Sequence, residues 1–174
     1  MKNGLETLYE RRSIRKYKAE QISNDELELV IKAGVCAPTA MNYQSPIIIA
    51  VQNPDEVKNL SRLNARIMGK EDTDPFYGAP TVLVVLADAN NKNAVKDGSL
   101  VMGNLLNAAY AVGLGSCWIN RATELFEMQE GKDLLKKWGI EGEYIGIGNC
   151  ILGYPDQEHP AMKPRKENYV YYVR

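Results

Sequence analysis

An uncharged stretch runs from Gly98 to Asn120 and reads GSLVMGNLLNAAYAVGLGSCWIN. Apolar side chains in its first part would lie on every side of a helix: Leu100, Val101, Leu105, Leu106, Ala108, Ala109 and Val112. A helix that is apolar all round is stable only when it is covered, so this stretch predicts a central buried helix. Gly113 and Gly115 are expected to end the helix, and residues 116–119 to form a short strand or a close-packed loop.

Other segments have the composition of strands. Residues 81–87 form a continuous apolar run, which is typical of a strand covered on both faces. A loop with two prolines, residues 37–46, leads into a second expected buried strand at residues 47–51. Tyr144–Gly153 predicts a strand interrupted by glycines. Residues 169–173 are aromatic and β-branched, but no hairpin partner follows them.

Start and stop signals frame the remaining helices. Ser23 and Glu26 have capping-box spacing, and Gly34 is placed as the left-handed stop of the helix that follows. Asn53 followed by Pro54 is typical of the start of the next helix.

Two further helical regions are expected near the ends of the chain. One covers residues 3–12, with Leu5, Leu8 and Tyr9 facing inward, and the other covers residues 123–138.

A central helix buried on all sides needs more cover than four or five strands of a 174-residue chain supply. A second copy of the chain could provide that cover. The tail, residues 169–173, could add as a strand to the sheet edge of another subunit. We therefore expect a symmetric homodimer, which is the commonest closed assembly.

Composition narrows the class of protein. A length of 174 residues fits one domain, residues 1–174. A net charge of −1 and a pI near 5.9 argue against a nucleic-acid partner. Three cysteines without C-x-x-C spacing and a single histidine indicate neither a disulfide framework nor a metal site, and a reducing cytoplasm is the expected location. No apolar run suggests export or a membrane partner.

Five cations fall within the eight positions from Arg11 to Lys18, and Ser13 lies among them. Arginine grips phosphate oxygens with a planar fork, while a serine hydroxyl and backbone N–H groups can take the remaining lone pairs. A second basic group contains Lys163 and Arg165. A charge run alone is more often a solvated helix face. Two such groups in a near-neutral chain favour a site for a small anion.

The sequence matches the common catalytic motifs poorly. Residues 146–148 (GIG) begin like a dinucleotide fingerprint, but Ile151 stands where glycine is needed, and an apolar strand continues where a helix should start. The sequence contains no Gly-Lys-Ser/Thr phosphate loop, no H-E-x-x-H and no G-x-S-x-G. A cysteine paired with His159 stays formally possible as a nucleophile, although a surface histidine is the commoner reading. Trp118 and Trp138 are expected to pack in the core.

Several motifs occur in an order that resembles the FMN-dependent nitroreductase family. None is specific alone, but together they span nearly the whole chain. They are residues 11–17 (RRSIRKY), 37–44 (APTAMNYQ), 76–80 (FYGAP), 97–99 (DGS), 113–118 (GLGSCW), 146–155 (GIGNCILGYP) and 163–165 (KPR).

The resemblance implies an α+β fold with a central, mostly antiparallel sheet flanked by helices, and a C-terminal strand that extends to the partner subunit of a homodimer. It implies two FMN molecules at the subunit interface, each held by both chains, with NADH or NADPH as the reductant. The phosphate and ribityl end would meet Arg11, Arg12, Ser13, Lys163 and Arg165. The flavin ring would meet Arg15, the backbone of Gly115, Ser116 and Cys117, and, from the partner, Pro38, Thr39, Ala40, Met41, Asn42 and Gln44.

The implied activity is ping-pong reduction of a small-molecule acceptor, such as a nitroaromatic or a quinone, by hydride transfer through flavin N5. The flavin would carry the chemistry, with Arg15 as electrostatic support for its reduced form. Ser45 and Ile47 depart from the Gln-Pro-aromatic pattern of many members. Two alternatives stay open: a flavin-binding sensor or regulator without efficient turnover, and a nucleic-acid-binding module that uses both basic groups.

Overall fold

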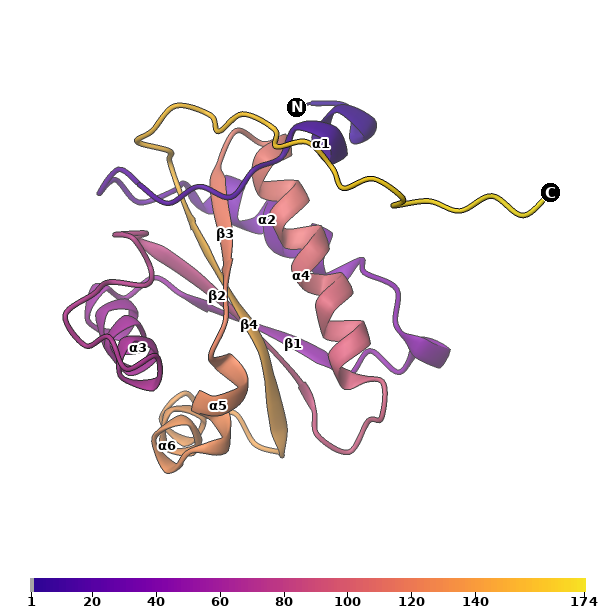
Figure 1. The fold of residues 1–174 in the computed structure, drawn as a ribbon. Coiled ribbons are helices and arrows are strands. Elements are labelled where there is room, and N and C mark those ends of the chain that lie inside the picture. The colour runs from indigo at the N-terminus through magenta and orange to yellow at the C-terminus, as the bar shows by residue number, and fades with distance from the viewer. Residues whose placement is uncertain (1) are drawn as a thin grey trace.

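The computed structural model describes residues 2–174, and its centre is a four-stranded antiparallel sheet (Figure 1). The strands are β1 (Pro46–Val51), β2 (Thr81–Asp88), β3 (Gly115–Ile119) and β4 (Tyr144–Gly153). Their order across the sheet is β1-β2-β4-β3, and all three pairings are antiparallel. The expected α+β fold with a mostly antiparallel sheet is confirmed.

Helices cover both faces of this sheet. They are α1 (Gly4–Glu10), α2 (Asn24–Val35), the short 3-10 helix η1 (Ala40–Asn42), α3 (Pro54–Ile67), α4 (Ala94–Ala111), α5 (Ala122–Glu127) and α6 (Gln129–Lys137). One hydrophobic cluster joins the sheet to α2 and α4, and a second cluster joins it to α3, α5 and α6. The sheet therefore lies between two helical layers (Figure 1).

Strand β2 shows why the sheet is buried on both faces. Val82, Val84 and Leu86 belong to the α3-side cluster, whereas Leu83 and Val85 belong to the α4-side cluster, and all five are fully buried. This alternation follows from the period of two in a strand. The expectation for residues 81–87 is confirmed.

Strand β1 lies at an edge, and that position corrects one expectation. Residues 47–49 are only half-buried and Ala50 is exposed, so among residues 47–51 only Val51 is buried. The apolar run was enough to predict the strand, but its exposure is set by its place in the sheet.

Local capping signals were read correctly from the sequence. Ser23 and Glu26 form both hydrogen bonds of a capping box at the start of α2. The Asn53 side chain accepts from two backbone N–H groups at the start of α3, and Pro54 takes the first helical position. Each cap satisfies N–H groups that a helix terminus would otherwise leave without a partner.

The stop of α2 was predicted wrongly. Gly34 lies inside the helix, which ends one residue later, and the cap residue Cys36 has a φ of −78°. A Cβ at Gly34 would lie 2.6 Å from the Leu105 side chain and 2.8 Å from that of Ile48. Glycine is therefore needed for close packing of α2 against α4, not for a left-handed turn.

Two other helical predictions need correction. The region 123–138 forms two helices, α5 and α6, because Met128 between them is extended. Gly113, with a φ of +92°, follows the end of α4, but Gly115 already belongs to β3. Trp118 and Trp138 do pack against the core, one in each hydrophobic cluster, although both are only half-buried.

Helix α4 is not buried on all sides within one chain. Met102, Leu105 and Ala109 are fully buried against the sheet and α2, but Leu100 is 48% exposed. One chain therefore does not cover α4 on all sides, and the cover of its exposed face by a second copy stays a prediction.

Helix α1 also departs from its predicted orientation. Leu5, Leu8 and Tyr9 are each more than 60% exposed, whereas Thr7 is buried. The expectation that these three residues face inward is wrong within one chain. Exposed apolar groups on neighbouring helices are typical of a surface that meets another protein.

Residues beyond β4 form an extended tail without a strand among the described residues (Figure 1). Tyr169, Val170 and Tyr171 are 61–80% exposed. The addition of this tail to a partner's sheet stays a prediction. Within residues 2–174, no helix has the length and apolar character needed to cross a membrane.

Gly146→Ala is expected to lower the free energy of unfolding by about 3 kcal/mol, because the added methyl would overlap the backbone carbonyl of Ala122. Urea unfolding followed by circular dichroism measures the change. Gly4→Ala is the matched control, since a Cβ there meets no atom of residues 2–174 within 4 Å, and its effect should stay within about 0.5 kcal/mol. Equal stability of both variants would contradict the close approach of β4 and α5.

Candidate functional site

The basic segment after α1 runs alongside strand β3. Ser13 forms a parallel bridge with Ser116, and the Ile14 N–H donates to the Ser116 carbonyl at 3.0 Å. Ile14 is buried, and a Cβ on Gly115 would approach it to 3.0 Å. Glycine at position 115 therefore lets the segment lie close to the strand, and Arg11–Ser13 comes to lie beside residues 115–117.

The same segment also pairs with residues that follow β4. The Lys18 N–H donates to the Tyr154 carbonyl at 2.9 Å, and the Asp156 N–H donates to the Lys16 carbonyl at 3.0 Å. The Arg15 N–H donates to the Gln157 side chain at 2.8 Å. These bonds fix the Arg15 backbone while its side chain stays exposed.

Tyr17 fastens the segment to the core. Its hydroxyl donates to the Ile14 carbonyl at 2.8 Å, and burial raises the pKa of this phenol well above its ordinary value. Tyr17 is therefore a neutral structural residue at physiological pH.

Arg11 and Arg12 carry buried nitrogen atoms that no group within residues 2–174 satisfies. The Arg11 Nη1 and Arg12 Nε atoms are buried and have no hydrogen-bond partner among the described residues. The Arg12 Nη1 does donate to the carbonyls of Tyr9 and Arg11, at 2.9 and 2.8 Å. Buried donors without acceptors are costly, so the arrangement fits an anion whose oxygen atoms complete it.

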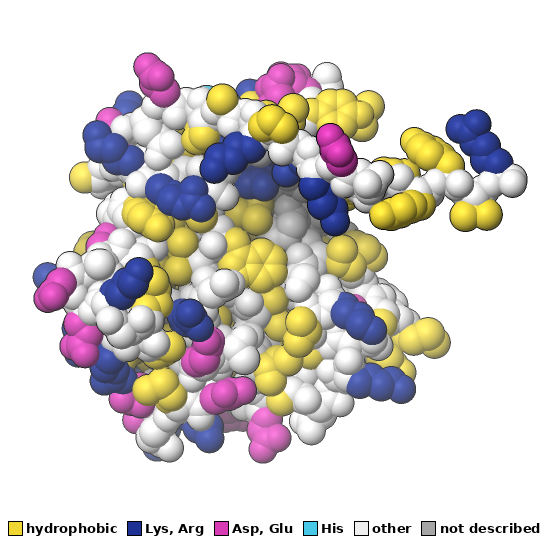
Figure 2. All heavy atoms as spheres, viewed as in Figure 1, with side chains coloured by type: hydrophobic (Ala, Val, Ile, Leu, Met, Phe, Trp, Pro, Cys, Tyr) yellow, Lys and Arg dark blue, Asp and Glu magenta, His cyan; other side chains and the backbone are white. Residues whose placement is uncertain are grey.

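Repulsion between neighbouring cations also supports an anion site at Arg11 and Arg12. Burial lowers the pKa of the Arg11 guanidinium, and the charge of Arg12 and, more weakly, that of Arg165 lower it further. Arg165 therefore acts on the same cluster from the C-terminal tail. Lys and Arg side chains gather under the tail, over the upper ends of β3 and α4 (Figure 2).

The start of the tail is held against α1. The His159 Nε2 lies 2.8 Å from the Glu10 carbonyl, and the His159 ring lies 5.3 Å from the Tyr110 ring. His159 is exposed, as expected for a surface loop. Cys150 is fully buried, which raises the pKa of its thiol to about 12, so this cysteine is not suited to act as a nucleophile.

The loop of residues 38–44 lies elsewhere, at the other end of α4 (Figure 1). The Ala40 N–H donates to Asp97 Oδ1 near the start of α4, whereas Lys2 and α1 contact the end of α4 at Tyr110. At about 1.5 Å per residue, the 18 residues of α4 span roughly 27 Å. One chain therefore does not bring the loop to the arginine cluster.

The candidate residues thus divide into two groups. The first lies beside β3 or in the tail and contains Arg11, Arg12, Ser13, Arg15, Gly115, Ser116, Cys117, Lys163 and Arg165. The second lies in the loop and contains Pro38, Thr39, Ala40, Met41, Asn42 and Gln44. Lys163 is exposed in the tail, and within residues 2–174 no hydrogen bond joins it to the other members of the first group.

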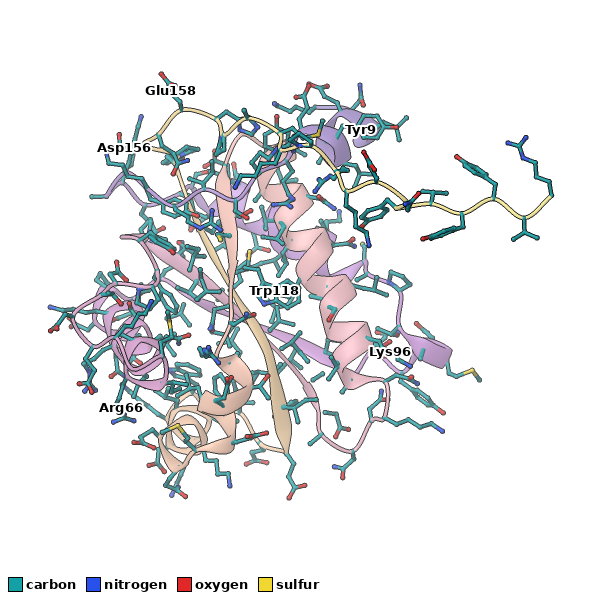
Figure 3. All side chains as sticks on the ribbon, in the orientation of Figure 1. Tyr9, Arg66, Lys96, Trp118, Asp156 and Glu158 are labelled. Carbon is teal, nitrogen blue, oxygen red and sulfur yellow. The ribbon has the colours of Figure 1, made fainter. Side chains whose placement is uncertain are left out.

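Two notable side chains near these groups were not selected from the sequence. The Trp118 side chain projects from β3 toward α4 (Figure 3), and its Nε1 is buried without a hydrogen-bond partner among the described residues. Asp97 is 3% exposed, and its Oδ2 also has no partner there. Neither residue belongs to a local sequence pattern that reveals a buried, unpaired polar atom.

Comparison with known proteins decides the family. The family model for the nitroreductase family matches residues 8–154. The chain belongs to the nitroreductase family. This nitroreductase-family chain is 32% identical over 163 residues to an Archaeoglobus fulgidus protein named as an NADH dehydrogenase/NAD(P)H nitroreductase, and the match covers 91% of this chain and 88% of that protein.

Solved structures agree with this assignment. A Bacteroides fragilis nitroreductase with bound FMN superposes on the nitroreductase-family chain with a TM-score of 0.88 at 29% identity, covering 99% of this chain and 100% of that one. A Desulfitobacterium hafniense nitroreductase with bound FMN has a TM-score of 0.86 at 25% identity, with full coverage of both chains (100% each).

Inorganic phosphate is expected to raise the melting temperature of the ligand-free protein, because an anion that completes the Arg11–Arg12 cluster binds only the folded chain. At a phosphate concentration one hundred times the dissociation constant, the stabilisation would be roughly 2.7 kcal/mol. Arg11→Ala should lose at least half of the shift measured by differential scanning fluorimetry.

Arg62→Ala is the matched control, because Arg62 is an exposed arginine of α3 that hydrogen-bonds Asn59 at 3.0 Å. It should keep the full phosphate response. Equal shifts for wild type and Arg11→Ala would remove Arg11 from the anion site.

Proposed function

We propose that this nitroreductase-family protein is an FMN-dependent NAD(P)H oxidoreductase that reduces nitroaromatics, quinones or related electrophiles. The observation that carries the proposal is the pair of buried guanidinium nitrogens on Arg11 and Arg12, beside β3, that have no hydrogen-bond partner in the described part of the chain. FMN ends in a dianionic phosphate, and arginine forks match the geometry of phosphate oxygens. Relatives with bound FMN support the choice of this anion.

The residues of the first group fit the phosphate end of FMN. Arg11, Arg12 and Ser13 approach it from the segment beside β3, and Arg165 adds charge from the tail. Lys163, two residues before Arg165, would join them from the tail. Placing a dianion among these cations would satisfy the buried donors and offset both the burial and the repulsion from neighbouring cations that lower the pKa of Arg11.

The flavin ring would extend from this end along β3. The backbone of Gly115, Ser116 and Cys117 would face one edge of the ring, and Arg15 would supply positive charge near it. When bound, FMN supplies the redox chemistry by accepting a hydride from NADH or NADPH and passing electrons to the acceptor. The chain itself would hold the ring, exclude water and place a cation where negative charge develops.

The second group would come from a partner subunit. Helix α4 carries the loop of residues 38–44 at one end and lies near the arginine cluster at the other. Two α4 helices packed antiparallel about a twofold axis would bring the loop of one chain to the cluster of the other. The exposed apolar residues Leu8, Tyr9 and Leu100 support such a homodimer, because association would bury them.

The purified protein is expected to be yellow, with flavin absorbance that bleaches when NADH or NADPH is added without oxygen. Bleaching and its reversal by a quinone or a nitroaromatic are followed by absorbance spectroscopy. Because one site would serve both substrates in turn, initial rates should give parallel double-reciprocal lines.

Two outcomes would favour a different function. A yellow protein that neither nucleotide bleaches would favour a flavin-binding sensor or regulator. A colourless protein that stays colourless with excess FMN and binds DNA or RNA in a salt-dependent manner would favour the nucleic-acid module.

Leu100→Glu is expected to raise the dimer dissociation constant at least tenfold, since a charge at an apolar interface costs more than about 1.4 kcal/mol. Analytical ultracentrifugation measures the dissociation constant, and the variant should also retain less FMN. Met68→Glu is the control, because Met68 is a 37% exposed apolar residue at the end of α3. A wild type that sediments as a monomer at micromolar concentration would contradict the shared site.

A further inference from the structure

Asp97 places a carboxylate in a buried position at the start of α4. Its residue is 3% exposed, and its Oδ1 accepts a hydrogen bond from the Ala40 N–H at 3.1 Å. A buried carboxylate is costly to desolvate, and hydrogen bonds and the positive end of a helix offset this cost. The structure therefore uses a buried charge to hold one backbone N–H of the loop of residues 38–44.

Asp97 does not cap its own helix. The N-cap position belongs to Asn93, whose side chain makes no capping bond, and the Asp97 backbone N–H donates to the Asn93 carbonyl. The Asp97 Oδ2 has no partner among residues 2–174. The side-chain hydrogen bond of Asp97 is thus made to the loop and not to α4.

The loop that Asp97 holds has an unusual backbone. Met41, Asn42 and Gln44 have φ values of +51°, +58° and +50°, a region that residues with a Cβ rarely adopt. The Gln44 N–H donates to the Thr39 hydroxyl at 3.1 Å, so the loop is closed by its own bonds. Met41, at its tip, is 83% exposed.

These bonds have different tasks. Bonds inside the loop fix its shape, but they do not place it on the body of the protein. The Ala40–Asp97 bond attaches the loop to the body of the protein, because Asp97 belongs to α4, whose core face is fully buried. The other end of α4 contacts Lys2, close to the arginine cluster. Helix α4 is therefore a rigid spacer between the two groups of candidate residues.

We propose that Asp97 is a positioning residue, which holds the loop of residues 38–44 at the height on α4 where it lines the flavin ring in the partner's site. This inference rests on the proposed function, because it requires bound FMN and a shared site. Asp97 does not touch the flavin. It acts through the Ala40 N–H, and loss of either group should release the loop.

Three variants separate loop placement from a general effect of the helix-end charge. Asp97→Ala removes the acceptor, whereas Asp97→Asn removes the charge but keeps an oxygen that can accept from Ala40. Ala40→Pro removes the donor and leaves Asp97 in place. Thr39 is already extended, with φ −127° and ψ 150°, as a residue before proline prefers. Ala40 is the second residue of a tight turn, which the Asn42 N–H closes by donating to the Thr39 carbonyl at 3.1 Å, and proline is favoured at that position.

Asp74→Ala is the matched control. Its carboxylate also anchors a loop, accepting from the Ser61 hydroxyl at 2.5 Å and from the N–H groups of Phe76 and Gly78 at 2.9 and 2.6 Å. That loop packs beside α3, on the other side of the sheet from α4 (Figure 1). Its loss should lower the melting temperature without a change at the flavin.

The test uses FMN-loaded protein and two readouts: the rate of FMN release on dilution, followed by flavin fluorescence, and the visible circular dichroism of bound flavin. Asp97→Ala and Ala40→Pro are each expected to release FMN about tenfold faster, as loss of a charge-assisted hydrogen bond implies. Both should change the flavin dichroism in the same way. The rate of FMN release from Asp97→Asn should be within about twofold of the wild-type rate.

The outcomes distinguish failure of this inference from failure of the proposed function. If Asp97→Ala does not fold, Ala40→Pro, on a partly exposed loop, carries the same test. Wild-type release rates and dichroism in Ala40→Pro, or an equal flavin change in Asp74→Ala, would overturn the inference while leaving the proposed function intact. A wild type that binds no FMN would instead remove the proposed function, and this inference with it.

Discussion

The pairing of Ser13 and Ile14 with Ser116 is the contact on which the arrangement of the site depends. It places a basic segment, which follows a short exposed helix, directly beside β3. The contact is possible because Gly115 has no side chain to keep Ile14 away and because Tyr17 fastens the segment from the other side. Without it, Arg11 and Arg12 would lie in solvent, where arginines bind anions weakly. With it, their unsatisfied nitrogens are buried at one fixed place.

Features that depend on a few adjacent residues were predictable from sequence. The caps at Ser23 and Asn53 and the strand of residues 81–87 follow from local chemistry, and all three are present. Gly34 was misread because its role, close contact with Leu105, depends on a helix 71 positions further along the chain. The inward face predicted for Leu8 failed for a related reason: apolar periodicity says that a face needs cover but not which chain provides it.

At the candidate site, too, roles that depend on distant residues could not be predicted from the sequence. Clustered charge and motif order point to the residues that we propose to bind an anion, since these signals depend on neighbouring positions. Asp97 occurred in one of those motifs, yet its task was invisible there, because it depends on a bond to Ala40, 57 positions away. Trp118 was read as a core residue, and it does pack against the core. That its indole N–H has no partner within residues 2–174 is evident only from the three-dimensional arrangement.

The placement of the two tryptophans has a practical consequence. Trp118 packs against the cluster under α4 and Trp138 against the cluster under α3, so each side of the sheet contains one of the two tryptophans. Emission from a protein with only one of them reports on one layer alone. The molecule thus carries its own optical labels for asking whether its two layers melt together or separately, without any dye attached.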